Sequence, residues 1–116
     1  MLVTLGGMNR AGGLAVSDRK AYAPAGSTQT DATQITSQLA DVTGADGTKG
    51  VILPKNINQV WVYSDTATNG LKVYPPSGMD INDGTTNAAV TIEGKTAALF
   101  VKVNETTFSA IFTADS

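Results

Sequence analysis

The stretch Thr96–Phe112, with the sequence TAALFVKVNETTFSAIF, decides the fold class of this chain. Apolar side chains recur at every second position on both sides of the polar segment 104–106. A period of two is the signature of β-strands, because successive side chains of a strand point to opposite faces of the sheet. The stretch therefore predicts two strands joined by a tight turn.

The first of these strands, residues 96–103, is apolar on both faces. One face carries Ala97, Leu99, Val101 and Val103, and the other carries Ala98 and Phe100. A domain of this size has one interior, so the second apolar face needs another cover. We expect a partner subunit there, and the alternative is a central strand that lies beneath an arm or a loop of the same chain.

The same alternation continues through the rest of the chain from residue 50 onward. Short apolar runs at 51–53, 59–65, 70–74 and 88–93 are separated by turn sequences rich in Gly, Pro, Asn and Asp. Strands of this length and spacing predict an all-β fold, namely a small antiparallel β-sandwich or barrel that is jelly-roll-like.

Residues 35–43 fit two structures. Ile35, Leu39 and Val42 have the i, i+4, i+7 spacing of one helix face. The surrounding Thr and Ser and the β-branched residues favour extended structure instead. We expect a strand.

The first 26 residues have a different composition from the remainder. Glycine pairs at 6–7 and 12–13 interrupt the apolar pieces, and Pro24 and Gly26 close the segment. Such a segment loses much conformational entropy on ordering and buries little surface by itself. We expect an extended N-terminal arm over residues 1–26, which is disordered or becomes ordered against another protein, and a β-domain over residues 27–116.

The composition removes most catalytic chemistry. The chain has no cysteine and no histidine, so a thiolate nucleophile and the commonest general base are both missing. The segment Asp80–Gly84 resembles the start of a calcium loop, but position 12 is Thr91 where an EF-hand needs a glutamate. We expect no enzyme, and no catalytic, metal or cofactor-binding residue.

Charge is also sparse. Charged residues make up 16% of the chain, the formal net charge is −2, and of the eight basic residues only Arg19 and Lys20 adjoin. We therefore expect no nucleic-acid partner, which would need a basic stripe. No apolar run approaches the ~20 residues of a membrane helix, and the N-terminus lacks the features of a signal peptide. We expect no membrane segment and synthesis in a cytoplasm.

Several short sequences together carry a resemblance. They are AGSTQTDATQIT at residues 25–36, GVILP at 50–54, LKVYP at 71–75 and NAAV at 87–90. In this order they resemble a β-domain of tailed-phage virion proteins, found in capsid decoration (cement) proteins and in head or tail fibres. The resemblance covers about residues 25–112, and Phe108 stands where similar sequences often have Trp.

The resemblance implies a structural virion protein. A decoration protein of this kind is expected to dock as a homotrimer on the major capsid protein at local threefold positions and to stabilise the shell, which places it on the capsid surface. The expected capsid-contact residues of the arm are Leu2, Val3, Leu5, Met8, Leu14 and Val16. The expected trimer-interface residues are Trp61, Tyr63, Phe100 and Phe108. The alternative is a fibre module in which Trp61, Tyr63 and Tyr74 bind a host glycan or protein.

Overall fold

The computed structural model describes residues 18–66 and 69–112 of the chain. Within these residues there are ten strands and no α-helix. In chain order the strands are β1 (Arg19–Tyr22), β2 (Thr33–Gln34), β3 (Leu39–Val42), β4 (Gly50–Ile52), β5 (Gln59–Ser64), β6 (Leu71–Tyr74), β7 (Asp80–Ile81), β8 (Val90–Ile92), β9 (Thr96–Lys102) and β10 (Thr107–Phe112). The expectation of an all-β fold is confirmed.

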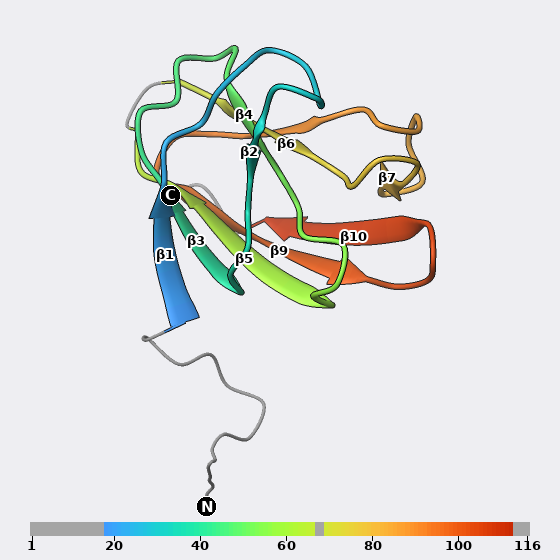
Figure 1. Cartoon of the computed structure of the whole chain (residues 1–116). Coiled ribbons are helices and arrows are strands. Elements are labelled where there is room, and N and C mark those ends of the chain that lie inside the picture. The colour runs from blue at the N-terminus through green and yellow to red at the C-terminus, as the bar shows by residue number, and fades with distance from the viewer. Residues whose placement is uncertain (1–17, 67–68, 113–116) are drawn as a thin grey trace, which may run out of the picture.

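The strands form two sheets that lie one above the other (Figure 1). A six-stranded sheet has the order β1-β3-β5-β9-β10-β7, and a four-stranded sheet has the order β2-β4-β6-β8. Both sheets are mixed. Strands β1, β3 and β5 run parallel to one another, as do β2, β4 and β6, while β5, β9 and β10 are successively antiparallel. The expectation of a purely antiparallel fold is therefore wrong.

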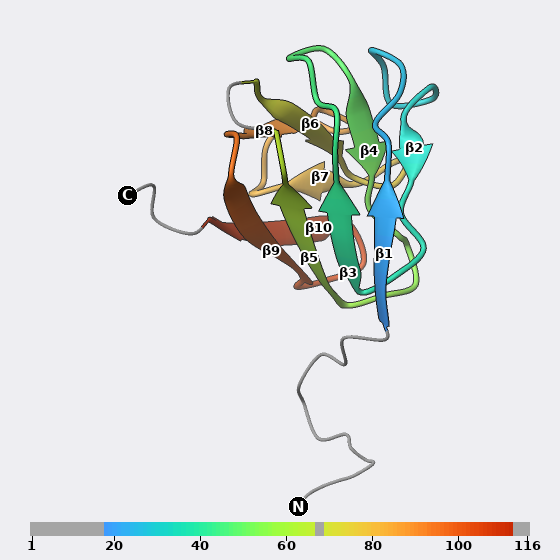
Figure 2. The ribbon, with the colours of Figure 1, turned by 90° about the vertical axis from the view of Figure 1, so that its left-hand side faces the viewer.

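The parallel pairs arise because the chain alternates between the two sheets. In the six-stranded sheet Arg19 pairs with Leu39, and Leu39 pairs with Trp61, so the chain returns after 20 and then 22 residues. Between two visits it forms one strand of the other sheet, as Figure 2 shows. A parallel pair needs a crossover connection, and here a strand of the opposite sheet takes the place usually filled by a helix.

The core lies between the two sheets. Inward-pointing residues alternate with outward-pointing ones, so every second residue is buried along β5, over 71–73 of β6 and over 96–101 of β9. The fully buried apolar side chains include Val60, Val62, Ala98, Phe100 and Phe108 from the six-stranded sheet, and Val51, Leu71, Val73 and Ile92 from the four-stranded sheet. Burial of this apolar surface is the main source of stability.

The strand expected within residues 35–43 is confirmed over Leu39–Val42. Ile35 is fully buried directly after β2, and its amide donates to the Ile52 carbonyl at 2.9 Å. The spacing that resembled a helix face therefore comes from residues of two separate extended segments. Ile35 and Val42 lie in the core, whereas Leu39 is only half-buried.

The expected arm boundary at residue 26 is wrong. Strand β1 pairs in parallel with β3, and Tyr22 is buried. The Tyr22 hydroxyl lies 2.9 Å from the Ser37 hydroxyl and accepts a hydrogen bond from the Thr36 amide at 2.9 Å. These bonds join β1 to the segment before β3, so residues 19–22 are part of the fold.

Candidate interaction surface

A row of apolar side chains crosses the outer face of the six-stranded sheet. Leu39 of β3 pairs with Trp61 of β5, Trp61 pairs with Leu99 of β9, and Leu99 pairs with Ile111 of β10. Directly paired residues of neighbouring strands point to the same face. Each of the four is adjacent to strand residues that point into the core, so the whole row points outward.

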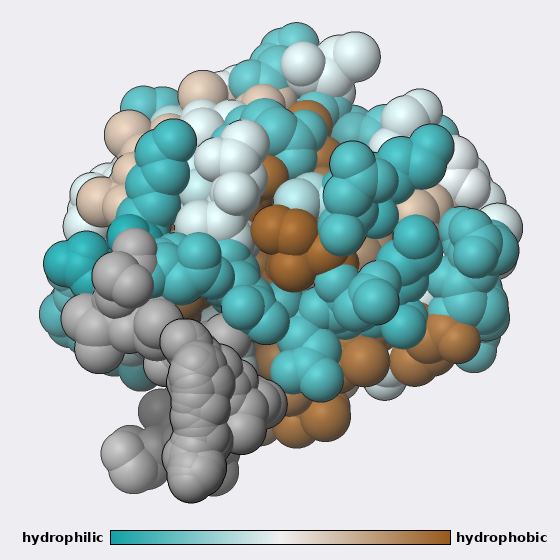
Figure 3. Space-filling model, turned by 60° about the horizontal axis from the view of Figure 1, so that its bottom comes forward, coloured by the Kyte–Doolittle hydropathy of each residue, from teal (hydrophilic) through white to brown (hydrophobic). Residues whose placement is uncertain are grey.

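A second apolar line runs along β9 and crosses this row at Leu99. Ala97, Leu99 and Val101 are half-buried, and Val103, directly after the strand, continues the alternation and is 56% exposed. Ile111 in the row is 59% exposed. We call these residues together the outer apolar patch, which consists of Leu39, Trp61, Ala97, Leu99, Val101, Val103 and Ile111. Seen from below, the molecule shows hydrophobic patches bordered by hydrophilic residues (Figure 3).

Polar and charged residues form the rim of this patch. Arg19 ends the row at β1, and Asp41 lies two residues beyond Leu39 on the same face of β3. Gln59 and Ser109 flank Val101 on β5 and β10. Asp41 Oδ1 is buried and has no hydrogen-bond partner among the described residues. An apolar centre with a polar rim is the usual arrangement of a protein–protein contact surface.

An ion pair lies on the same face, where β5 ends and β9 begins. Lys95 Nζ lies 2.8 Å from Asp65 Oδ1, and both side chains are partly exposed. The hydrogen bond and the charge of Asp65 raise the pKa of Lys95, and the charges of Tyr63 and Asp41 contribute in the same direction. Because the pair is exposed, it adds little to stability and mainly marks the polar end of the face.

The structure divides the four expected interface residues into two pairs. Trp61 and Tyr63 are half-buried and lie together on the outer face of β5. Phe100 and Phe108 are fully buried between the two sheets of the same chain. Their assignment to a subunit interface is wrong, because a side chain with no exposed surface has none to offer a partner.

Sequence reasoning missed Leu39 and Ile111 as members of the candidate surface. The signal for Ile111 was the alternation of β10, which places Phe108 inward and Ile111 outward. Leu39 joins the surface only through the parallel pairing of β3 with β5, which the sequence did not indicate. The expected arm residues Leu2, Val3, Leu5, Met8, Leu14 and Val16 lie outside the described residues.

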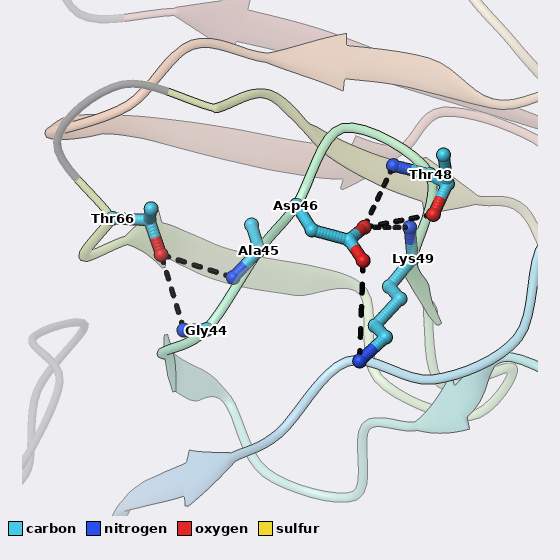
Figure 4. A network of polar contacts seen from close by, with 6 residues as sticks. All are labelled: Gly44, Ala45, Asp46, Thr48, Lys49 and Thr66. Carbon is cyan, nitrogen blue, oxygen red and sulfur yellow. Dashed lines mark hydrogen bonds and ion pairs between the residues drawn. The ribbon is translucent and has the colours of Figure 1, made fainter.

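The best-defined polar cluster supports a turn rather than a reaction (Figure 4). Asp46 Oδ1 accepts hydrogen bonds from the Thr48 amide at 2.9 Å, the Thr48 hydroxyl at 2.8 Å and the Lys49 amide at 3.1 Å. These bonds, those to the Thr48 amide and hydroxyl above all, lower the pKa of Asp46. The carboxylate therefore satisfies the donors of the loop before β4, which is the role that an Asp in a turn commonly has.

A groove lies beside β2 and β4. Its two adjoining hollows share Gln34 and Lys55, and other amide, hydroxyl and apolar side chains complete the lining. The Gln34 side-chain amide donates to the carbonyl groups of Ile35, Ile52 and Leu53, so it holds the edge of the sheet together. Neither hollow is lined by a carboxylate, and across residues 18–66 and 69–112 no His, Cys, Asp or Glu side chains gather into a group of three that would hold a metal ion.

Comparison with known proteins adds no assignment: no family model, no curated protein and no solved structure matches the chain. In the part of the chain that the structure describes, no helix has the length and apolar character needed to cross a membrane. The observations thus define a class, a mixed-sheet all-β protein with an apolar surface on its larger sheet.

Proposed function

We propose that this chain is a structural virion protein, a capsid decoration (cement) protein that binds the major capsid protein of a phage head as a homotrimer and stabilises the shell. The single observation that carries the proposal is the outer apolar patch on the six-stranded sheet, which offers a contact area on a β-sandwich. The kind of assembly, a homotrimer on the major capsid protein, is what the sequence resemblance over residues 25–112 implies.

The proposed mechanism relies on rigidity and on repeated contacts. Two sheets that share one core hold the patch in a fixed shape, so little conformational entropy is lost when a partner covers it. A trimer presents three copies of each weak contact to the shell, and the effective concentration of the second and third contacts makes the sum strong. In this mechanism apolar residues of the N-terminal segment, such as Leu14 and Val16, contact the capsid.

The test is binding to purified phage heads that lack their decoration protein. The purified chain is mixed with such heads, and bound protein is measured by co-sedimentation together with the temperature at which the heads release DNA. We expect saturable binding in multiples of three chains per site and a higher release temperature. The double variant L14S/V16S should fold normally but bind fewer sites at equal concentration.

The proposal fails if the folded chain leaves both the sedimentation and the release temperature of the heads unchanged. Unaltered binding by the L14S/V16S variant would refute only the part of the proposal in which the N-terminal segment contacts the capsid.

A fibre module that binds a host glycan is the second candidate. It is favoured by the half-buried Trp61 and Tyr63 on one exposed sheet face, since aromatic rings stack on sugars. Glycan-array binding by the wild-type chain, abolished in Trp61→Ala while the fold is retained, would select this function over the first.

A further inference from the structure

We infer that the outer apolar patch is the surface on which a second copy of this chain docks, with Trp61, Leu99 and Ile111 at the centre of the contact. The inference rests on the proposed function and deepens it, because it names the face through which the oligomer assembles. It also replaces Phe100 and Phe108, which belong to the core.

The size of the patch matches what association of two copies needs. From Leu39 to Ile111 there are three strand spacings, or about 14 Å, and from Ala97 to Val103 six residue steps, or about 20 Å. With the width of the side chains and the rim this is on the order of 500 Å² for each partner. Two copies would then bury on the order of 1,000 Å², the lower limit for a specific interface.

The chemistry of the patch allows the same surface of neighbouring copies to converge at a threefold axis, as a homotrimer requires. The seven patch residues carry no charge. The charges beside them on the face have opposite signs at each side: Arg19 and Asp41 at the β1–β3 side, and Lys95 and Asp65 where β5 ends. Two copies can therefore meet without burying like charges against each other, which would cost several kcal/mol, by the general magnitude for such pairs. Trp61 supplies the kind of large aromatic anchor that dominates contact energies.

The edge of the sheet next to the patch points to the same occupant. Strand β7 pairs with β10 only at Thr107 and Phe108, and further along the Ala110 amide donates to the Asn82 side chain at 2.8 Å instead of to a strand. Beyond Ala110, Ile111 is 59% exposed and Phe112 is 44% exposed. An apolar strand edge of this kind is a template on which another chain can add, so a neighbouring copy that contacts the patch can also cover this edge.

The chain contains its own probe for this contact. Trp61 is the only tryptophan, and it lies in the patch. We expect its fluorescence to shift to shorter wavelength, and its quenching by acrylamide to fall, over the concentration range in which light scattering shows monomers associating. Both signals should change together, because covering the patch excludes water from the indole ring.

Two substitutions test the surface, and a third serves as the matched control. Ile111→Lys places a charge in the patch, and Leu99→Thr removes apolar area while keeping a side chain that favours strands. Each should raise the dissociation constant at least about 10-fold, which corresponds to about 1.4 kcal/mol. Thr91→Lys, at an exposed position on the outer face of β8, adds the same charge to the opposite sheet and should leave association unchanged.

The outcomes separate this inference from the proposed function. A wild-type chain that stays monomeric at the highest attainable concentration, or an oligomer that Ile111→Lys and Leu99→Thr both leave intact, overturns the inference even if the chain binds phage heads. An oligomer that these two variants weaken, in a chain that binds no heads, supports the inference and refutes the capsid function. Far-UV circular dichroism checks the fold of each variant. If Ile111→Lys does not fold, the result for Leu99→Thr decides the test.

Discussion

Alanine substitutions of the neighbouring residues Phe100 and Leu99 distinguish a core residue from an interface residue most directly. Phe100 and Leu99 are neighbours on β9, and they point to opposite faces of the same sheet. Phe100 is fully buried, whereas Leu99 is half-buried and lies in the outer apolar patch. Replacing each by alanine therefore removes a large side chain from the same strand, with different physical consequences.

The structure sets the expected magnitudes. For Phe100→Ala the lost transfer free energy is about 2.5 kcal/mol, for roughly 100 Å² of apolar surface at about 25 cal/mol per Å². The cavity left between the sheets adds to this, because the surrounding side chains relax only in part, and the total is about 3–5 kcal/mol. For Leu99→Ala the half-buried side chain gives about 1 kcal/mol in the monomer.

The assay is urea denaturation followed by far-UV circular dichroism at a concentration low enough to keep the chain monomeric, combined with light scattering at high concentration. We expect Phe100→Ala to lower the free energy of unfolding strongly and Leu99→Ala to weaken association more than it lowers stability. A Phe100→Ala chain that keeps its unfolding free energy within 1 kcal/mol but loses association would refute the placement of Phe100 in the core, since a core truncation costs about 3–5 kcal/mol.

Three further predictions concern the fold that carries the patch. Tyr22→Phe should lower the free energy of unfolding by about 1–3 kcal/mol, because it leaves the Thr36 amide without its acceptor, and hydrogen exchange at β1 should accelerate. Gly50→Ala should destabilise the chain in thermal melts, since its Cβ would lie 2.8 Å from a backbone oxygen of β6. The pKa of Asp46 is lowered in the folded state, so its contribution to stability is present above its ordinary pKa and fades as the pH falls through the lower folded value. Acid titration of Asp46→Asn should lack this component, and an identical acid-unfolding curve would contradict it.

How far the candidate surface could be predicted depends on the residue. The alternation of strand 96–103 indicated two apolar faces, and the structure places Ala98 and Phe100 inward and Leu99 and Val101 outward. The alternation did not indicate which face was the interior, so Phe100 was assigned to the wrong side. Alternation gives relative orientation only, because either face of an isolated strand can become the buried one.

The sequence by itself determined that the chain is built from strands, where most of them lie and which residues share a face. These properties follow from local chemistry: β-branched and apolar residues at every second position, and Gly, Pro, Asn and Asp between the runs. It also determined that cysteine and histidine chemistry is absent.

Only the tertiary structure decided that β3 and β5 are parallel neighbours although 22 residues separate Leu39 from Trp61. Strand pairing depends on contacts between residues far apart in the chain, and those contacts leave no periodic signal in either strand alone. The winding of the chain between two sheets joins Leu39, Trp61, Leu99 and Ile111 into one row. The patch is thus a product of register, which the sequence encodes only through the packing of the whole core.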